Sequence, residues 1–222
     1  MIDLQMFSER VLRYSLLAAF FMSLGYLSVV FLVIMYLQGV RGLSPLDASL
    51  LLISGYVVGS LLSPMMGRLS DRYGARIIAT SGIIVVEIAV LLYMTLGMNS
   101  PPYIVLIAST ISGFGTSMFF PANNSAVMKR APSGSYGSLS GLLRTLQNIG
   151  VLGSFVTTIS VASASVPRSV AFDIFIGTSN LTGSIASEFI IGIDSALTVS
   201  FVLLAIAGAM SFVRGKDKLL NY

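Results

Sequence analysis

Long runs of apolar residues, separated by short polar segments, make up most of the chain after residue 13. About 20 consecutive apolar residues are enough to cross ~30 Å of hydrocarbon as a helix. Segments rich in Gly, Pro, Asn or charged residues mark the ends of such runs. The pattern predicts six membrane-spanning helices, at residues 14–37, 46–66, 77–97, 103–121, 139–162 and 190–212.

The remaining segments are interpreted as ends and connections of one membrane domain that covers residues 1–222. Residues 1–13 form a short amphipathic lead-in, and residues 163–189 form an outer loop with a helix along the membrane interface. Residues 122–138 are polar and are expected to connect the fourth and fifth spans. The fold class expected from this arrangement is an all-α membrane protein.

Composition agrees with a membrane protein and excludes several other classes. Hydrophobic residues make up 55% of the chain and charged residues only 10%, and the mean hydropathy of +0.90 is far above that of an ordinary soluble domain. The chain has no cysteine and no histidine, which removes the commonest nucleophiles, general bases and metal ligands. We therefore expect no enzyme activity, no cofactor and no metal site.

Basic residues are distributed unevenly between the two membrane faces that six spans define. Of the 13 Lys and Arg residues, 10 fall on the side that holds both termini and the segments 67–76 and 122–138. The positive-inside rule then places both termini in the cytoplasm of an integral, cell-membrane protein surrounded by lipid. Because the charges lie in connections rather than on one folded face, the net charge of +4 does not predict nucleic-acid binding.

The densest charged segment is Gly67-Arg68-Leu69-Ser70-Asp71-Arg72-Tyr73-Gly74-Ala75-Arg76. A polar segment between two apolar runs cannot lie in hydrocarbon, so it marks a membrane face. Its order, Gly-x-Leu-x-Asp-Arg-x-Gly-x-Arg, resembles the loop signature of the major facilitator superfamily, which joins the second and third helices of a six-helix half. It departs at Ala75, where the family usually has a basic residue. The resemblance implies a conformational latch that pairs charges and contacts helix ends, made of Gly67, Arg68, Leu69, Asp71, Arg72, Gly74 and Arg76.

Four further segments resemble the C-terminal half of the fourteen-helix drug:proton antiporter branch of that family. They are residues 31–40, 42–48, 141–150 and 191–197. The resemblance implies one half of a major facilitator fold, a 3+3 inverted repeat, and proton-coupled export of small amphipathic or drug-like molecules through a central cavity.

Two departures from the branch bear on this expectation. Its Gly-Pro-rich antiporter motif is in none of the spans, and Arg144 stands where the branch usually has Asn, with Gln147 where it has Arg. Six helices supply one wall of a cavity, so we expect a half-transporter that pairs with a second copy or a complementary six-helix half. The alternative is a non-transporting membrane subunit or a truncated remnant of a larger transporter.

Glu87 and Arg144 are the candidate proton or charge sites. A carboxyl near the middle of a span is costly when charged and unpaired, and it favours its neutral form there, as a proton-coupling site requires. The competing interpretation of Glu87 is a structural contact between helices or subunits. Arg144 either holds an anion or pairs with a carboxylate; alternatively, it extends to the nearby cytoplasmic headgroups.

Six polar side chains are candidates for lining a cavity, each with a structural alternative. Gln147 and Asn148 share a polar stripe with Arg144 at helical spacing. Asn123 and Asn124 follow Pro121, and helix capping is the alternative role for these two residues. Tyr26 and Tyr36 lie on the first span, where anchoring at the membrane interface is the alternative for Tyr36. Glycines at 113, 115, 150 and 153 are interpreted as sites of close helix packing.

Overall fold

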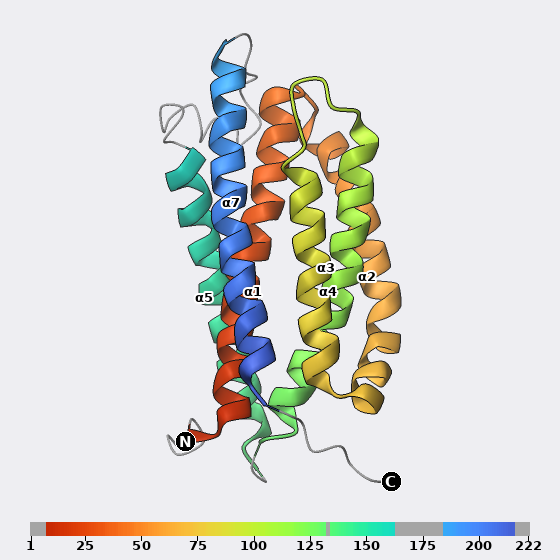
Figure 1. Cartoon of the computed structure of the whole chain (residues 1–222), viewed down its shortest axis with the longest axis vertical. Helices are drawn as coiled ribbons and strands as arrows, with labels where there is room; N and C mark the ends of the chain where they lie inside the picture. Colours follow the sequence, from red (N-terminus) through yellow and green to blue (C-terminus); the bar gives the residue numbers. More distant parts are fainter. Residues whose placement is uncertain (1–7, 132–133, 163–183, 216–222) are drawn as a thin grey trace.

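The computed structural model describes residues 8–131, 134–162 and 184–215, and within these ranges every regular element is a helix. This confirms the all-α fold class. The helices run side by side as one elongated bundle (Figure 1). Their bounds are α1 Arg10–Met35, the π-helix η2 Tyr36–Val40, α2 Pro45–Tyr73, α3 Ala75–Tyr93, α4 Pro102–Met128, α5 Tyr136–Ala162 and α7 Ser184–Val213.

The ends of α2 follow from local sequence. The Ser44 hydroxyl accepts a hydrogen bond from the Asp47 backbone N–H at 3.2 Å, and Pro45 occupies the first turn; both features are typical of a helix start. The helix ends at Gly74, whose φ of 92° is disfavoured for residues that have a Cβ. A single glycine therefore separates α2 from α3.

Two predicted connections are largely helical. The segment 67–76 was expected to be a loop, but α2 continues through Tyr73 because residues 67–73 include no proline that would interrupt its backbone hydrogen bonds. The fourth span was expected to end at Pro121, but α4 continues to Met128 with Pro121 inside it. A proline removes one backbone hydrogen bond, and packing of the following turn compensates here, since Ala122 and Asn123 are fully buried. The expected interface helix at 163–189 lies mostly outside the described residues.

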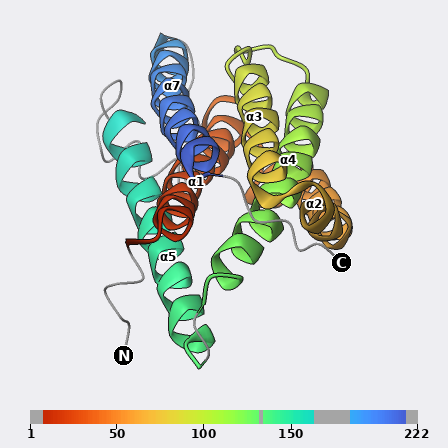
Figure 2. The same ribbon diagram turned by 60° about the horizontal axis from the view of Figure 1, so that its bottom comes forward.

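The helices pack as expected for two equivalent groups of three, α1 to α3 and α4 to α7. The helix α1 packs against α5 and α7, while α4 packs against α2 and α3. Exchanging α1 with α4, α2 with α5, and α3 with α7 converts one set of pairs into the other. Figures 1 and 2 show the result, with α1 and α4 central, α3 and α7 together on one side, and α2 and α5 at the flanks. This arrangement agrees with a half built as a 3+3 repeat.

The closest helix contact joins α2 and α4 through glycines. A Cβ added to Gly113 would lie 2.0 Å from the carbonyl oxygen of Gly55, and one added to Gly55 would lie 2.3 Å from the carbonyl oxygen of Ser109. On another face of α4, a Cβ on Gly115 would lie 2.6 Å from the carbonyl oxygen of Gly82 in α3. Glycine thus lets α4 approach two neighbours at backbone distance, as expected for membrane helices.

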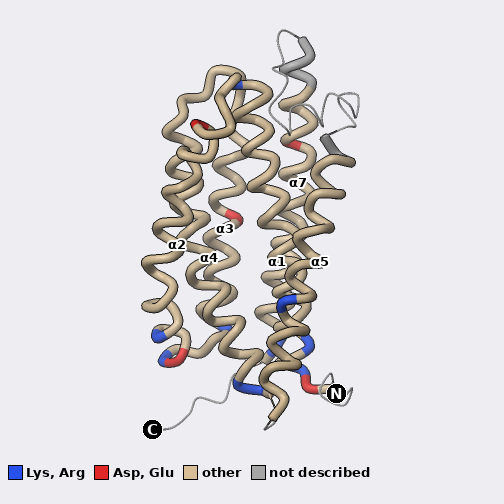
Figure 3. The backbone as a smooth tube through the Cα atoms, turned by 180° about the vertical axis from the view of Figure 1, so that it is seen from behind, with Lys and Arg blue, Asp and Glu red and all other residues tan. Residues whose placement is uncertain are grey.

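Five helical segments of the described chain are long and apolar enough to cross a membrane. They are Arg10–Val40, Pro45–Tyr73, Ala75–Tyr93, Pro102–Met128 and Phe189–Val213. The helix α5 is as long as α4 but is not one of the five, because its first half carries polar residues. Figure 3 shows Lys and Arg gathered at the end of the bundle where both termini lie.

Candidate functional site

The segment that carries the family signature forms the last turns of α2 and the start of α3. Arg68, Asp71 and Arg72 are exposed at the charged end of the bundle. The Asp71 carboxylate pairs with the Lys129 ammonium at 2.7 Å, which joins the end of α2 to the end of α4. Both side chains are about half exposed, at 60% and 49%, so the ion pair adds at most about 1 kcal/mol to stability.

Two further charged contacts join helix ends at the same end of the bundle. The Arg76 guanidinium lies 4.3 Å from the centre of the Phe212 ring, which links α3 to α7 through a cation–π contact. The Arg130 guanidinium pairs with the Glu9 carboxylate, which links the segment after α4 to the start of α1. All six helices except α5 are therefore tied at this end by charged side chains, a geometry suited to holding one arrangement of helices.

A buried polar cluster lies where α1, α4 and α7 meet near this end. The Arg214 side chain is fully buried, and its Nη1 donates to Asn123 Oδ1 at 3.1 Å and to Ser15 Oγ at 3.4 Å. Asn123 Nδ2 in turn donates to the Ser15 carbonyl oxygen at 3.1 Å. Asn123 is thus placed in contact between three helices, and its role in lining a cavity stays a prediction. Arg214 was not a candidate because it follows the last apolar run and was counted with the tail.

Tyrosine and serine hydroxyls of α1, α2, α3 and α4 gather at one place in the bundle, level with Tyr93 at the end of α3. A void of about 10 Å³ is lined by Tyr26, Val30, Leu52, Gly55, Tyr56, Tyr93, Ser109 and Ser112. The Ser54 and Ser109 hydroxyls are 2.6 Å apart. A space of this size and polarity matches one water molecule. Among the sequence candidates only Tyr26 lies here. The hydroxyl residues Ser109, Ser112 and Thr116 of α4 recur at the helical spacing that signals this face.

Tyr36 lies at the other end of the bundle, in η2, and is almost fully buried. Its hydroxyl donates to the carbonyl oxygen of Gly97 at 2.7 Å, and Arg41 Nη1 donates to the carbonyl oxygen of Met98 at 2.8 Å. These bonds hold the end of the first span against the connection between α3 and α4. The structure therefore does not bring Tyr36 together with Tyr26.

The polar stripe of α5 divides between two environments. Gln147 is buried, while Arg144 and Asn148 are exposed. Arg144 Nη1 donates a long hydrogen bond of 3.4 Å to Gln147 Oε1. Gln147 Nε2, and Asn124 Oδ1 in α4, are both buried with no hydrogen-bond partner among the described residues. Polar groups of this kind are suited to contact water or a ligand.

Glu87 lies near the middle of α3, half-buried, and Figure 3 shows an isolated acidic position there. The described part of the chain gives its carboxyl neither a hydrogen bond nor an ion pair. A charged side chain at the centre of a span costs on the order of 3 kcal/mol. The helix α3 faces α4 and α7, so Glu87 is remote from Arg144 on α5. The two candidate charge sites are not brought together.

A search of the described residues for three or more His, Cys, Asp or Glu side chains placed to hold a metal ion finds none. These residues instead form one charged end, where ion pairs and a cation–π contact join the helices. They also place polar side chains inside helices of membrane length.

Comparison with known proteins gives the family. A model of the Major Facilitator Superfamily matches residues 3–155. The chain is 25% identical to the lincomycin resistance protein LmrB of Listeria innocua over 202 residues, which are 88% of this chain and 42% of that protein. It is 28% identical to the riboflavin transporter RibZ of Clostridioides difficile over 148 residues, 67% of this chain and 32% of that protein.

A third relative is the multidrug efflux pump LfrA of Mycolicibacterium smegmatis. It is 22% identical over 173 residues, which are 75% of this chain and 34% of the pump. The chain thus spans less than half the length of each of these three relatives.

Proposed function

The chain belongs to the major facilitator superfamily, and we propose that it forms one wall of a membrane transporter that exports small amphipathic or drug-like molecules, driven by protons. The proposal draws on relatives named for lincomycin resistance and multidrug efflux. Transport needs a polar path through the bilayer that is bounded by helices, and the bundle has one helix suited to face such a path.

The observation that carries the proposal is the exposed polar side of α5. Arg144, Thr145 and Asn148 lie within a helix of membrane length and are all exposed. Polar side chains exposed to hydrocarbon are costly, so membrane helices direct them to water-filled cavities or to protein. We assign this side of α5 to the transport path, with Arg144 as the charge coupled to the substrate or to a proton.

A second half is needed to close that path. The helix α2 is mostly exposed and carries an open groove of about 430 Å³, lined by Leu61, Pro64, Met65, Arg68, Leu69 and Arg72. Its exposed apolar side chains fit a protein partner as well as lipid. A homodimer or a complex with a complementary six-helix half would cover this face. The native mass in mild detergent tests the pairing: a discrete dimer of 23.6 kDa chains supports the two-copy form.

Orientation forms part of the same proposal. Lys and Arg gather at the end of the bundle that holds both termini (Figure 3), and such an excess is typical of the cytoplasmic side. Cysteines introduced at exposed positions near the N-terminus should therefore react with a membrane-impermeant maleimide only after cells are opened. The natural chain lacks cysteine, so the labelling has no background.

The test of transport is efflux of a fluorescent amphipathic dye from cells that produce the chain. Cells should accumulate less dye than controls, a protonophore should remove the difference, and Arg144→Gln should remove it as well. Arg10→Gln, which removes an exposed charge outside the proposed path, is the matched control and should export normally. Equal accumulation with and without the chain would contradict the proposal.

A non-transporting membrane subunit is the second candidate function, and the Asp71–Lys129 pair separates the two. Asp71→Lys places two cations together and should abolish export while the helical content is kept. The double variant Asp71→Lys/Lys129→Asp restores opposite charges and should recover part of it. A subunit that only stabilises a partner should tolerate both changes, because an ion pair this exposed contributes little to stability.

A further inference from the structure

We propose that the outer face of α3 around Glu87 binds a membrane-spanning helix of a partner chain that carries a Lys or Arg near the middle of the bilayer. The site is separate from the polar side of α5, which is assigned to the transport path, and from the exposed side of α2, which is assigned to the second half. The inference starts from a mid-membrane carboxyl, that of Glu87, which has no partner among the residues that the structure describes.

Glu87 is placed too deep to reach water easily. It is the thirteenth residue of α3, which begins at Ala75, so it lies about 18 Å along the helix from that end. The neighbouring turns face α7: the Thr80 hydroxyl donates to Ser211 Oγ at 2.9 Å, and Ile83 lies against Gly208. Glu87 continues this stripe by one turn, at the outer edge of the contact between α3 and α7.

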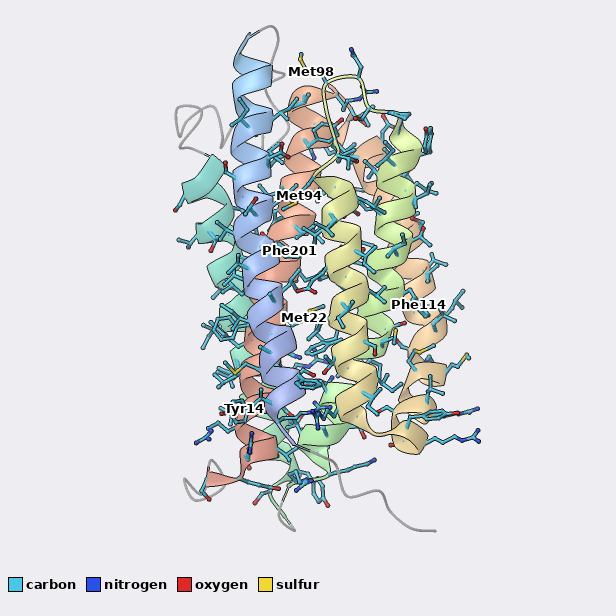
Figure 4. The ribbon with its side chains drawn as sticks, viewed as in Figure 1. Tyr14, Met22, Met94, Met98, Phe114 and Phe201 are labelled. Atoms are coloured by element: carbon cyan, nitrogen blue, oxygen red, sulfur yellow. The ribbon has the colours of Figure 1, made fainter. Side chains whose placement is uncertain are left out.

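The interior beside this edge is filled by apolar side chains. Met22 is fully buried and Phe201 packs against the same hydrophobic core; Figure 4 shows both between the ribbons of α7 and α3. The Thr80 hydroxyl of α3 and the Ser211 hydroxyl of α7 already bond to each other, and no described residue forms a hydrogen bond or ion pair with the Glu87 carboxyl. The half-buried carboxyl is therefore open to a partner from outside the bundle.

The surface around Glu87 suits a helix. Ile84, Ile88 and Leu91 are each about half exposed, at 50%, 48% and 50%, and form an aliphatic ridge on α3. Across the edge, α7 presents the small residues Ala205, Gly208 and Ala209. A ridge beside small residues lets a further helix approach closely, and the carboxyl at their border selects a cation on that helix.

A second copy of the chain fits this face less well. A two-fold contact through α3 would place two Glu87 carboxyls together and would supply a cation to neither of them. Arg144, the ninth residue of α5, is an exposed cation inside a helix, but the proposed function already uses it. Charge complementarity therefore favours a different chain.

The experiment uses the full chain in lipid nanodiscs and a synthetic leucine-rich transmembrane peptide with one central Lys. The same peptide with Leu in place of Lys is the reference, and both are dye-labelled for resonance energy transfer to the labelled chain. The Lys peptide is expected to bind at least about tenfold more tightly than the Leu peptide. Glu87→Gln and Glu87→Leu should both reduce its binding to the level of the Leu peptide.

Asp194→Asn is the matched control, because it also removes a carboxyl from a span but lies on α7; it should keep the preference for the Lys peptide. Circular dichroism and gel filtration verify that each variant folds. Equal binding of both peptides to the natural chain would overturn the proposal, as would a Lys preference that survives Glu87→Leu. If the natural chain associates with itself and Glu87→Leu removes that association, the occupant of the face is a second copy, and the proposal is also overturned. Dye export is measured separately, so a failure of transport does not count here.

Discussion

Replacing Gly113 by alanine is expected to destabilise the contact between α2 and α4 more than any other single added methyl group in the described bundle. The added Cβ would lie 2.0 Å from the Gly55 carbonyl oxygen and 2.6 Å from its carbonyl carbon and Cα. These are backbone atoms, so no side-chain rotation relieves the overlap. The two helices have to move apart by more than ~1 Å to restore van der Waals contact.

The expected loss follows from overpacking at a rigid contact. Forcing extra methyl groups into a well-packed interior typically costs about 1–3 kcal/mol. For a chain of this length, that corresponds to a fall of roughly 2–12 °C in the thermal midpoint. The intrinsic helix preference of Ala over Gly opposes the loss only weakly, because membrane helices remain largely formed when their packing is lost.

Two matched substitutions give a graded series. A Cβ on Gly59 would lie 3.3 Å from the Gly113 carbonyl oxygen, and a Cβ on Gly141 in α5 would meet nothing within 4 Å. Gly141→Ala should therefore change the midpoint little, and Gly59→Ala should fall between the two. The chain has no tryptophan, so the midpoint is measured by heating detergent-solubilised protein and following its gel-filtration peak. Equal midpoints for Gly113→Ala and Gly141→Ala would refute the close approach of α2 and α4.

Three further outcomes are expected. Asn123→Ala should lower the free energy of unfolding by about 1–3 kcal/mol, because it leaves buried hydrogen-bonding groups unsatisfied. Asn148→Ala, at an exposed position, should not. The same heating assay compares the two variants, and equal midpoints would contradict the buried cluster. Tyr36→Phe should cost about 1 kcal/mol by removing one hydrogen bond to a backbone carbonyl, and an unchanged midpoint in that assay would count against the bond. Glu87→Gln should retain protonophore-sensitive dye export, because Glu87 lies on the side of the bundle away from the proposed path. Export that no longer responds to the protonophore would instead identify Glu87 as a proton-coupling residue.

Much of the fold could be predicted because membrane insertion depends on local composition. Each span is visible as an apolar run, and the fold class and the family followed from those runs and from the segment 67–76. The errors lay at helix ends. Residues 67–73 and 122–128 are polar and were taken for connections, yet they continue α2 and α4, since polar residues can extend a helix beyond the hydrocarbon.

The candidate site could be predicted only in part. The sequence identified Asp71 as a charged group that pairs at a helix end, and it identified the glycines of α4 as positions of close packing. It did not identify Lys129 as the partner of Asp71, because the two residues are 58 positions apart. It also placed Arg144, Gln147 and Asn148 in one stripe, of which the structure buries only Gln147.

The sequence by itself determined that this chain is a helical membrane protein, which ends of its helices carry charge, and which family it belongs to. These properties depend on residues that are close together along the chain. The tertiary structure decided that Arg214 is buried against Asn123 and that Tyr26 meets the α2–α4 side of the bundle. It also left Glu87 half-buried, with no hydrogen-bond or ion-pair partner in the described part of the chain. Each of these contacts depends on how a helix is rotated about its axis and on which helix lies beside it. Because the spans of this chain are apolar on nearly every side, their hydrophobic pattern does not specify that rotation.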